Sequence, residues 1–139
     1  MFKLKLAALL AITAAFAVGC SGAAAAPQGG TVSATVSDMK VTVDRTSVPA
    51  GAVTFVVKNT GAVIHELVVL QTDVAQDKIA MDMDETGKMD ETGNVGETGD
   101  VDAGQSKTFT VTLPAGHYVL MCNEIGHYAA GMHMTFTVN

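Results

Sequence analysis

The chain has few cysteines, few basic residues and no long hydrophobic run, and each scarcity narrows what it can be. Only two of its 139 residues are cysteine, and it has eight Lys or Arg residues against fourteen Asp or Glu residues. So acidic a chain is an unfavourable partner for nucleic acid, whose phosphates attract basic surfaces. The apolar run over residues 6–18 is too short for a good membrane span, which needs about 20 residues. The length allows one domain.

The N-terminal residues predict export from the cytoplasm. Lys3 and Lys5 precede the apolar run and small residues follow it, which is the layout of a secretory signal peptide over residues 1–19. We therefore expect the protein in the periplasm or on the outer face of the cell envelope. Residues 20–30, rich in Gly and Ala, have no periodicity and predict a flexible tether.

Residues 17–20, Ala-Val-Gly-Cys, resemble a bacterial lipobox, although Ala17 stands where leucine is usual. In lipoproteins the signal is cleaved before such a cysteine, which then carries lipid. We therefore favour a lipid anchor on Cys20 that attaches the protein to the membrane. Ordinary signal peptidase cleavage within residues 23–26 is the alternative, and it leaves a free protein.

The small number of cysteines has a consequence for the rest of the chain. Exported proteins usually use cysteines in pairs, as disulfides. Cys20 is either lipidated or removed with the signal, so Cys122 has no partner. An unpaired thiol is a liability in an oxidising compartment unless something protects it or uses it. Binding of a metal ion does both.

Residues 31–139 have the pattern of β-strands. Apolar and polar residues alternate over residues 53–58, 108–113 and 132–138, which is the period of half-buried strands. Turns of the form Pro-Ala-Gly separate some of these stretches, and no capped helical stripe is present. About seven short strands joined by turns predict an all-β domain, an antiparallel Greek-key β-sandwich.

Residues 81–102 differ from the sequence around them. They contain three imperfect copies of the hexapeptide Met-Asp-Glu-Thr-Gly-Lys, and they carry eight acidic residues against one base, Lys88. Such a composition does not build a core, so we predict a solvated, flexible loop inserted in the domain. An EF-hand calcium loop is excluded, because Gly93 stands where a bidentate Glu is required. An acidic docking surface for a basic redox partner is a second interpretation, and a plain repeat expansion is the one we favour.

The C-terminal residues carry the chemistry. Cys122, His127 and Met132 follow one another with the spacing C-x4-H-x4-M, just before the last predicted strand. A thiolate and imidazoles in a trigonal arrangement, with a weak axial thioether, make a blue-copper electron-transfer centre. That centre requires a second imidazole, and His65 is the upstream candidate. Each residue alone has an ordinary structural explanation, but one copper ion explains all four and the unpaired cysteine. Four further residues are left outside the site: His117, Met121, His133 and Met134.

These features resemble the cupredoxin family, which includes plastocyanin and azurin. The resemblance rests on the C-x4-H-x4-M loop, on the closing residues Met-Thr-Phe-Thr-Val-Asn, and on residues 48–61 followed by His65. The ligand spacing is most similar to the rusticyanin and sulfocyanin branch. It implies a cupredoxin-like fold and one type 1 copper ion with four ligands: His65, Cys122, His127 and Met132. Several members carry Asn after the first histidine, so we expect Glu66 to take its supporting role here, and Asn123 to hydrogen bond to the thiolate.

The resemblance also implies a function. We expect a monomer that carries single electrons between redox partner proteins by cycling between Cu(I) and Cu(II), and not an enzyme. A periplasmic copper carrier or storage protein would share the donors but would need an exchangeable site, and it is the alternative. The binuclear copper centre of cytochrome oxidase subunit II is excluded, because it needs a second cysteine in the loop. A cysteine hydrolase using Cys122 and His127 lacks an evident orienting acid, and a metal-free adhesion module has no reason to carry four donors.

Overall fold

The computed structural model describes residues 29–85 and 87–139, and within them the chain forms nine β-strands and no helix. In chain order the strands are β1 (Gly30–Ser37), β2 (Lys40–Val43), β3 (Ser47–Val48), β4 (Gly51–Asn59), β5 (Val68–Gln71), β6 (Asn94–Glu97), β7 (Ser106–Leu113), β8 (Gly116–Met121) and β9 (His133–Val138). No helix among the described residues has the length and hydrophobicity of a membrane span. The predicted signal peptide, Cys20 and the tether up to residue 28 lie outside the described residues, whereas Gly30, at the end of the predicted tether, already begins β1.

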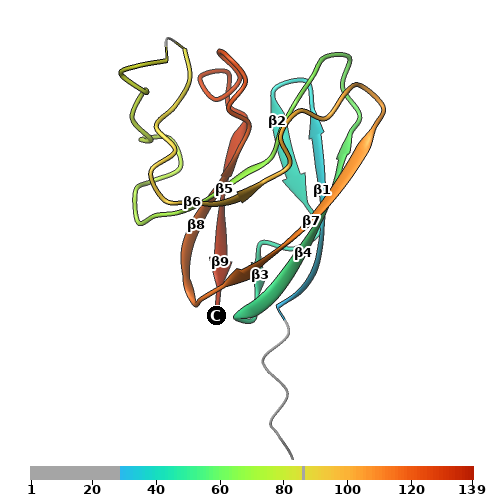
Figure 1. The fold of residues 1–139 in the computed structure, drawn as a ribbon, viewed down its shortest axis with the longest axis vertical. Helices are drawn as coiled ribbons and strands as arrows, with labels where there is room; N and C mark the ends of the chain where they lie inside the picture. Colours follow the sequence, from blue (N-terminus) through green and yellow to red (C-terminus); the bar gives the residue numbers. More distant parts are fainter. Residues whose placement is uncertain (1–28, 86) are drawn as a thin grey trace, which may run out of the picture.

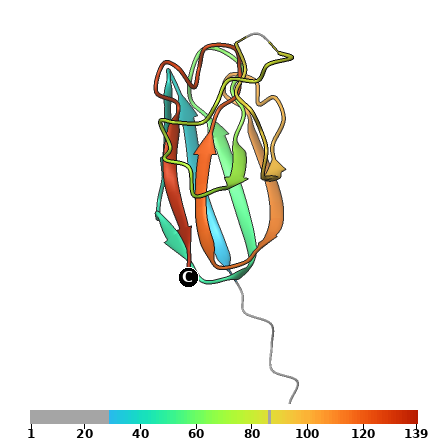
Figure 2. The ribbon, with the colours of Figure 1, turned by 90° about the vertical axis from the view of Figure 1, so that its left-hand side faces the viewer.

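The strands form two sheets that face one another as a sandwich (Figures 1 and 2). One sheet has the order β2-β1-β4-β7, and the other has the order β3-β9-β8-β5-β6. The predicted all-β sandwich is thus confirmed. The expectation of purely antiparallel pairing was wrong for two pairs, because β1 runs parallel to β4 and β3 runs parallel to β9. Between β1 and β4 the chain visits the opposite sheet at β3, so these two strands are not joined by a hairpin that would make them antiparallel.

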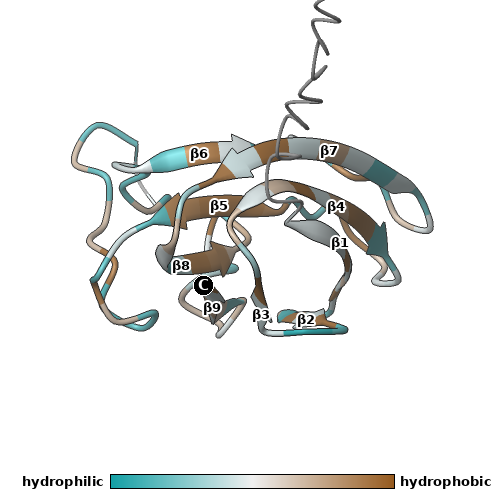
Figure 3. Cartoon of the chain, turned by 90° about the horizontal axis from the view of Figure 1, so that it is seen from below, coloured by the Kyte–Doolittle hydropathy of each residue, from teal (hydrophilic) through white to brown (hydrophobic). Residues whose placement is uncertain are grey.

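The main core lies between the sheets and follows the alternation in the sequence. In β4 the side chains of Val53, Phe55 and Val57 are wholly buried, while the residues between them point outward. Phe55 stacks on Phe109 of the same sheet at 5.2 Å between ring centroids and meets Phe136 of the opposite sheet at 5.8 Å. Burial of each large apolar side chain contributes about 1.5–3 kcal/mol. In Figure 3 the hydrophobic colour gathers on β4, β5 and β8, and the hydrophilic colour on the connections.

Strands β5 and β8 are buried on both faces, unlike the other strands. Val68, Leu70, Val119 and Met121 form a second apolar cluster on the outer face of their sheet, together with Tyr128. The connection between β5 and β6, residues 72–93, covers this face and is called the strap below. It packs the side chains of Ile79 and Met89 on the cluster. Figure 2 shows the strap crossing in front of this sheet.

The prediction of a solvated, flexible loop over residues 81–102 was wrong at Met89, which packs on the outer cluster, and for the second half of the segment, which joins the sheet. Residues 94–97 form the edge strand β6, which pairs with β5. Val101 is wholly buried, and Val95 packs against the main core. The acidic side chains stay at the surface while the backbone completes the edge of the sheet and two valines reach inward. Composition averaged over the segment concealed these two apolar positions.

Candidate metal centre

The loop between β8 and β9, residues 122–132, holds the predicted C-x4-H-x4-M motif at one end of the sandwich (Figure 1). The backbone N–H of Cys122 donates to the carbonyl of Met132 at 3.0 Å, which closes the loop at its base. Gly126 and Gly131 have φ angles of 80° and 105°. Because this left-handed region is costly for other residues, the two glycines allow the loop its tight path.

His65 lies just before β5, where it forms an isolated bridge to Val101. The two backbones exchange hydrogen bonds of 3.2 and 2.7 Å. The buried amide of Asn59 donates to the carbonyls of Val63 and Val101, at 2.7 and 2.8 Å, and so ties both flanks of the bridge to the end of β4. A Cβ atom at Gly61 would lie 2.8 Å from Nε2 of His65. Any larger residue at position 61 would therefore collide with the imidazole of His65 in its present position.

The structure brings His65, Cys122 and His127 together, although 57 positions separate the first two. Nδ1 of His65 lies 3.2 Å from Nδ1 of His127. Sγ of Cys122 lies 3.4 Å from Nδ1 of His127 and 4.0 Å from Nδ1 of His65. A point equidistant from these three atoms lies about 2.1 Å from each, a distance close to the lengths of metal–imidazole and metal–thiolate bonds. The three donors therefore fit a single metal ion.

Met132 supplies a thioether in the same neighbourhood. Its backbone N–H donates to the carbonyl of His127 at 3.1 Å, and its carbonyl accepts from Cys122. The side chain is wholly buried and belongs to the same apolar cluster as Cys122. Two imidazoles and a thiolate, with a soft thioether beside them, are the donors that suit copper.

Burial makes the charged forms of these donors unfavourable in the absence of a metal. It raises the pKa of the Cys122 thiol to about 11, although the backbone N–H of Glu66, 3.4 Å from Sγ, acts in the opposite direction. Burial also lowers the pKa of His65, and the neighbouring His127 lowers it further. His65 therefore offers a neutral nitrogen to a metal ion, and binding of the ion must displace the thiol proton.

Glu66 connects the two segments that carry the donors. Its carboxylate Oε1 accepts the backbone N–H of Asn123 at 3.1 Å, so the residue after His65 is tied to the residue after Cys122. This is the contact expected of a residue that supports both ligand segments. Burial raises the pKa of Glu66 to about 7; Lys88 opposes the rise, and the acids around it, Glu124 first, add to it.

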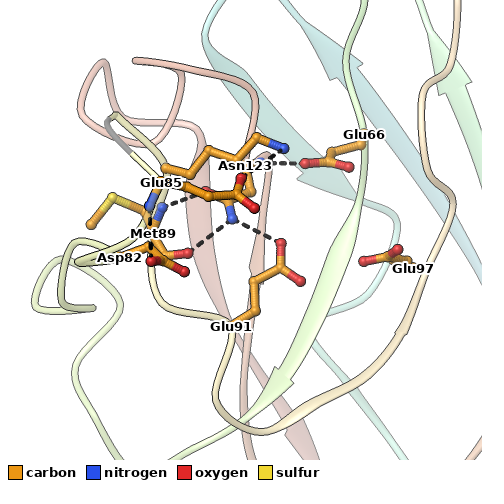
Figure 4. Close-up of a pocket in the computed structure, with 8 residues that line it drawn as sticks. Glu66, Asp82, Glu85, Met89, Glu91, Glu97 and Asn123 are labelled. Atoms are coloured by element: carbon orange, nitrogen blue, oxygen red, sulfur yellow. Dashed lines mark hydrogen bonds and ion pairs between the residues drawn. The ribbon is translucent and has the colours of Figure 1, made fainter.

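The prediction that Asn123 hydrogen bonds to the sulfur was wrong. Its side chain reaches the strap instead, where it contacts the backbone of Met89 and the carboxylate of Glu91 (Figure 4). Backbone groups take that place: the N–H of Glu66 lies 3.4 Å from the sulfur, and the backbone of Glu124 also hydrogen bonds to it. No sequence signal marks this contact, because it joins positions more than thirty residues apart.

An acidic cavity of about 300 Å³ opens beside this contact (Figure 4). Five carboxylates line it, with Lys88, Met89 and Asn123: Glu66, Asp82, Glu85, Glu91 and Glu97. Carboxylate oxygens of Glu66, Asp100 and Glu124 also lie within 4.8 Å of one another. Sequence reasoning missed both groups, because their members come from three separate segments.

The histidines and methionines that were left outside the site have other surroundings. His117 is exposed on β8, and Met134 packs against the main core. The ring of His133 lies 4.6 Å from that of Tyr128, and its Nδ1 is buried with no hydrogen-bond partner among the described residues. Met121 belongs to the outer cluster.

Comparisons with known proteins agree with the fold. A family model for a cupredoxin-like domain matches residues 8–138. Auracyanin from the photosynthetic bacterium Roseiflexus castenholzii is 26% identical, with a TM-score of 0.61 over 81% of this chain and 98% of its own. Auracyanin B is also 26% identical, with a TM-score of 0.60 over 84% of this chain and 99% of its own.

Rusticyanin from Thiobacillus ferrooxidans shares the fold, with a TM-score of 0.64 at 21% identity over 80% of this chain and 78% of its own. No curated protein sequence is significantly similar to this chain. The family model covers nearly all of the chain, and the donor set is one that suits copper. The chain therefore belongs to the cupredoxin-like family, as its C-terminal motif predicted, and its cofactor is copper.

Proposed function

We propose that this protein is a type 1 copper protein that carries single electrons between redox partner proteins outside the cytoplasm. In this proposal His65, Cys122 and His127 hold the ion in a plane and Met132 is the axial donor. Bound copper supplies the chemistry by alternating between Cu(I) and Cu(II). The observation that carries the proposal is the triangle of three donor atoms centred about 2.1 Å from each of them.

The backbone around the donors is suited to electron transfer because it is already fixed. His65 is held by the bridge to Val101, Cys122 by the hydrogen bond to Met132, and His127 by the turn that returns to Glu124 at 2.9 Å. Donors held in this way rearrange little when the charge of the ion changes. A small rearrangement lowers the barrier to electron exchange.

Electrons would enter and leave through His127, the only one of the four donor residues that is not buried. Exposed apolar residues flank both histidines in the sequence: Val63 and Ile64 before His65, and Ile125 before His127, the last with 68% of its surface exposed. Such residues favour contact with a partner, because association removes them from water. Tyr128 does not join this surface, since it is 7% exposed and faces the strap.

Spectroscopy of the copper-loaded protein tests the proposal. We expect the intense visible absorption of a Cu(II)–thiolate bond and a narrow parallel hyperfine splitting in the EPR spectrum. The Cys122→Ser variant should lose both signals, whereas Met134→Leu, outside the donor set, should keep them. A colourless loaded protein, or colour retained by Cys122→Ser, contradicts the proposal.

A copper carrier or storage protein is the second candidate, because it needs the same donors. Three of the four donor residues are wholly buried, which favours retention of the ion over its exchange. We expect the loaded protein to release copper to a chelator over hours and to exchange electrons much faster than that. Release within seconds would favour the carrier.

We also propose that the protein is exported and lipid-anchored through Cys20, the last residue of the lipobox-like sequence. The unpaired Cys122, which metal binding would protect in an oxidising compartment, agrees with export. Mass spectrometry of the protein extracted from membranes should show a lipidated N-terminal cysteine. An unmodified N-terminus downstream of residue 20 contradicts the anchor.

A further inference from the structure

The strap, residues 72–93, contacts the β8–β9 loop at three positions that lie between the proposed copper ligands in the sequence. These positions are Asn123, Gly126 and Tyr128, so Asn123 directly follows Cys122 and Tyr128 directly follows His127. Each contact includes hydrogen bonds to the backbone of the strap. The strap therefore lies along the loop and does not only cover the sheet.

Asn123 makes the contact nearest to the sulfur. Its Oδ1 accepts the N–H of Met89 at 2.7 Å, and its Nδ2 donates to the carbonyl of Met89 at 3.0 Å and to Oε1 of Glu91 at 2.8 Å. Both amide protons are thus used, and the side chain is 2% exposed. Because the N–H of Asn123 also donates to Glu66, this residue joins the strap, the loop and the segment of His65.

Tyr128 makes the contact next to His127. Its hydroxyl donates to the carbonyl of Gln76 at 2.6 Å and accepts the N–H of Ile79 at 3.0 Å. Its ring belongs to the outer apolar cluster, so the residue is fixed at both ends. Removal of the hydroxyl would leave two polar groups of the strap without this partner.

Gly126 makes the third contact, midway between the other two. Its N–H donates to the carbonyl of Gly87 at 3.3 Å. Gly87 has a φ angle of 89°, and a Cβ atom there would lie 2.8 Å from Cγ2 of Ile125. A side chain on Gly87 would therefore adopt a strained backbone conformation and displace the side chain of Ile125.

We propose that the strap is a brace for the copper centre, in which Asn123 and Tyr128 are positioning residues for Cys122 and His127. The local turns of the β8–β9 loop fix its shape, and the strap fixes its position against the sheet. The acidic side chains of the strap are then secondary to its backbone, which supplies most of these contacts. The part that concerns copper rests on the proposed function, whereas the hold on the loop does not.

The Tyr128→Phe variant tests the brace, because it keeps the ring and removes only the hydroxyl. Tyr118→Phe is the matched control, since the buried Tyr118 donates to the carbonyl of Pro114 at 2.7 Å, outside the strap and the loop. Amide hydrogen exchange is measured in the purified protein, copper-free and copper-loaded. We expect exchange about tenfold faster in Tyr128→Phe over residues 76–91 and 122–132, because two hydrogen bonds are lost. The control should leave both segments unchanged.

The copper signals provide the second measurement. Tyr128→Phe and Asn123→Ala should change the EPR hyperfine splitting and the reduction potential, although neither residue is a proposed ligand. Asn94→Ala is the control for the second variant, because the amide of Asn94 donates to Glu91 and Glu97 and does not touch the loop. The control should leave the splitting and the potential as they are in the unaltered protein.

Three results would overturn the brace. Faster exchange confined to the strap, with the loop and the copper signals unchanged, would show that the strap covers the sheet but does not hold the loop. Equal effects of Tyr128→Phe and Tyr118→Phe would show that loss of a buried hydroxyl destabilises the whole protein and has no specific effect on the loop. Unchanged exchange in both segments would show that the Tyr128 hydroxyl does not hold the strap to the loop. If the unaltered protein forms no blue-copper centre, the proposed function fails, and exchange in the copper-free protein still decides whether the strap holds the loop.

Discussion

The β8–β9 loop and the strap lie side by side at one end of the molecule, and they contribute in opposite ways (Figures 1 and 2). The loop carries three of the four proposed copper donors within eleven residues that include two left-handed glycines. The strap carries none of the proposed donors, and its described residues contribute backbone hydrogen bonds, the carboxylate of Glu91 and two apolar side chains, Ile79 and Met89. The comparison separates two roles in a metal centre: one segment carries the ligands, and another contacts that segment and can hold it in position. Mutations can separate the two parts.

Removal of a donor should have the largest effect. We expect His65→Ala to lose the blue-copper absorption, because the proposed trigonal donor set loses one of its two nitrogens. His117→Ala removes an exposed imidazole outside the site and is the matched control. Visible absorption after copper loading measures both. Equal colour in the two variants would remove His65 from the ligand set.

Displacement of a donor should have the next largest effect. In Gly61→Ala the new Cβ atom would press on Nε2 of His65 from 2.8 Å, so we expect destabilisation by about 1–3 kcal/mol and weaker copper binding. Gly116→Ala is the control, because the nearest atom there is 3.5 Å away. Thermal unfolding and copper titration measure the outcome. Unchanged copper affinity in Gly61→Ala would show that His65 adapts.

The stability of the copper-free protein should depend on pH through Glu66, which links the segment of His65 to the β8–β9 loop. Because burial raises the pKa of Glu66 in the folded state to about 7 from its ordinary value of 4.5, the folded state binds the proton more tightly than the unfolded state. The contribution of Glu66 to stability is therefore present at low pH and is lost as the pH rises from about 4.5 to 7, by up to about 3 kcal/mol. Glu66→Gln keeps an oxygen for the N–H of Asn123 and should remove this loss. Denaturant unfolding at several pH values measures it, and parallel curves for the two proteins would contradict the prediction.

Outward charges of the strap should have the smallest effect. Asp84→Asn and Glu85→Gln change exposed side chains, and Glu85 is only 4.0 Å from Lys88 in an exposed pair. We expect less than about 0.5 kcal/mol in stability and no change in the EPR spectrum. A shifted hyperfine splitting in the double variant would mean that charge, and not backbone contact, links the strap to copper.

Much of the site could be predicted because its donors are chemically rare and closely spaced. Cys122, His127 and Met132 lie within eleven residues, and the lone thiol demanded an explanation. The position of Glu66 next to His65 was likewise enough to suggest its supporting contact. The role of Asn123 was misread, because its partners Met89 and Glu91 lie in another segment, and hydrogen bonds between distant segments leave no mark in the local sequence.

The acidic segment was the largest error in the fold, and a neglected signal explains it. Residues 67–70 and 118–121 are apolar without alternation, a pattern that indicates strands buried on both faces. Strands of that kind require a cover on the outer side of the sheet, and the strap is that cover. The need for a cover could thus be read from the apolar strands β5 and β8, and not from the acidic repeat itself.

The sequence by itself determined the all-β character, through residues that alternate with a period of two, and the identity of the metal, through the softness of its donors. Only the tertiary structure decided that β1 and β4 run parallel, that His65 reaches Cys122 across 57 positions, and that the acidic repeat hydrogen bonds to the loop of Cys122 through Met89. The physical reason is the range of the interactions. Side-chain chemistry and alternation are local properties, whereas pairing, burial and hydrogen bonds between loops depend on where the folded backbone places distant residues.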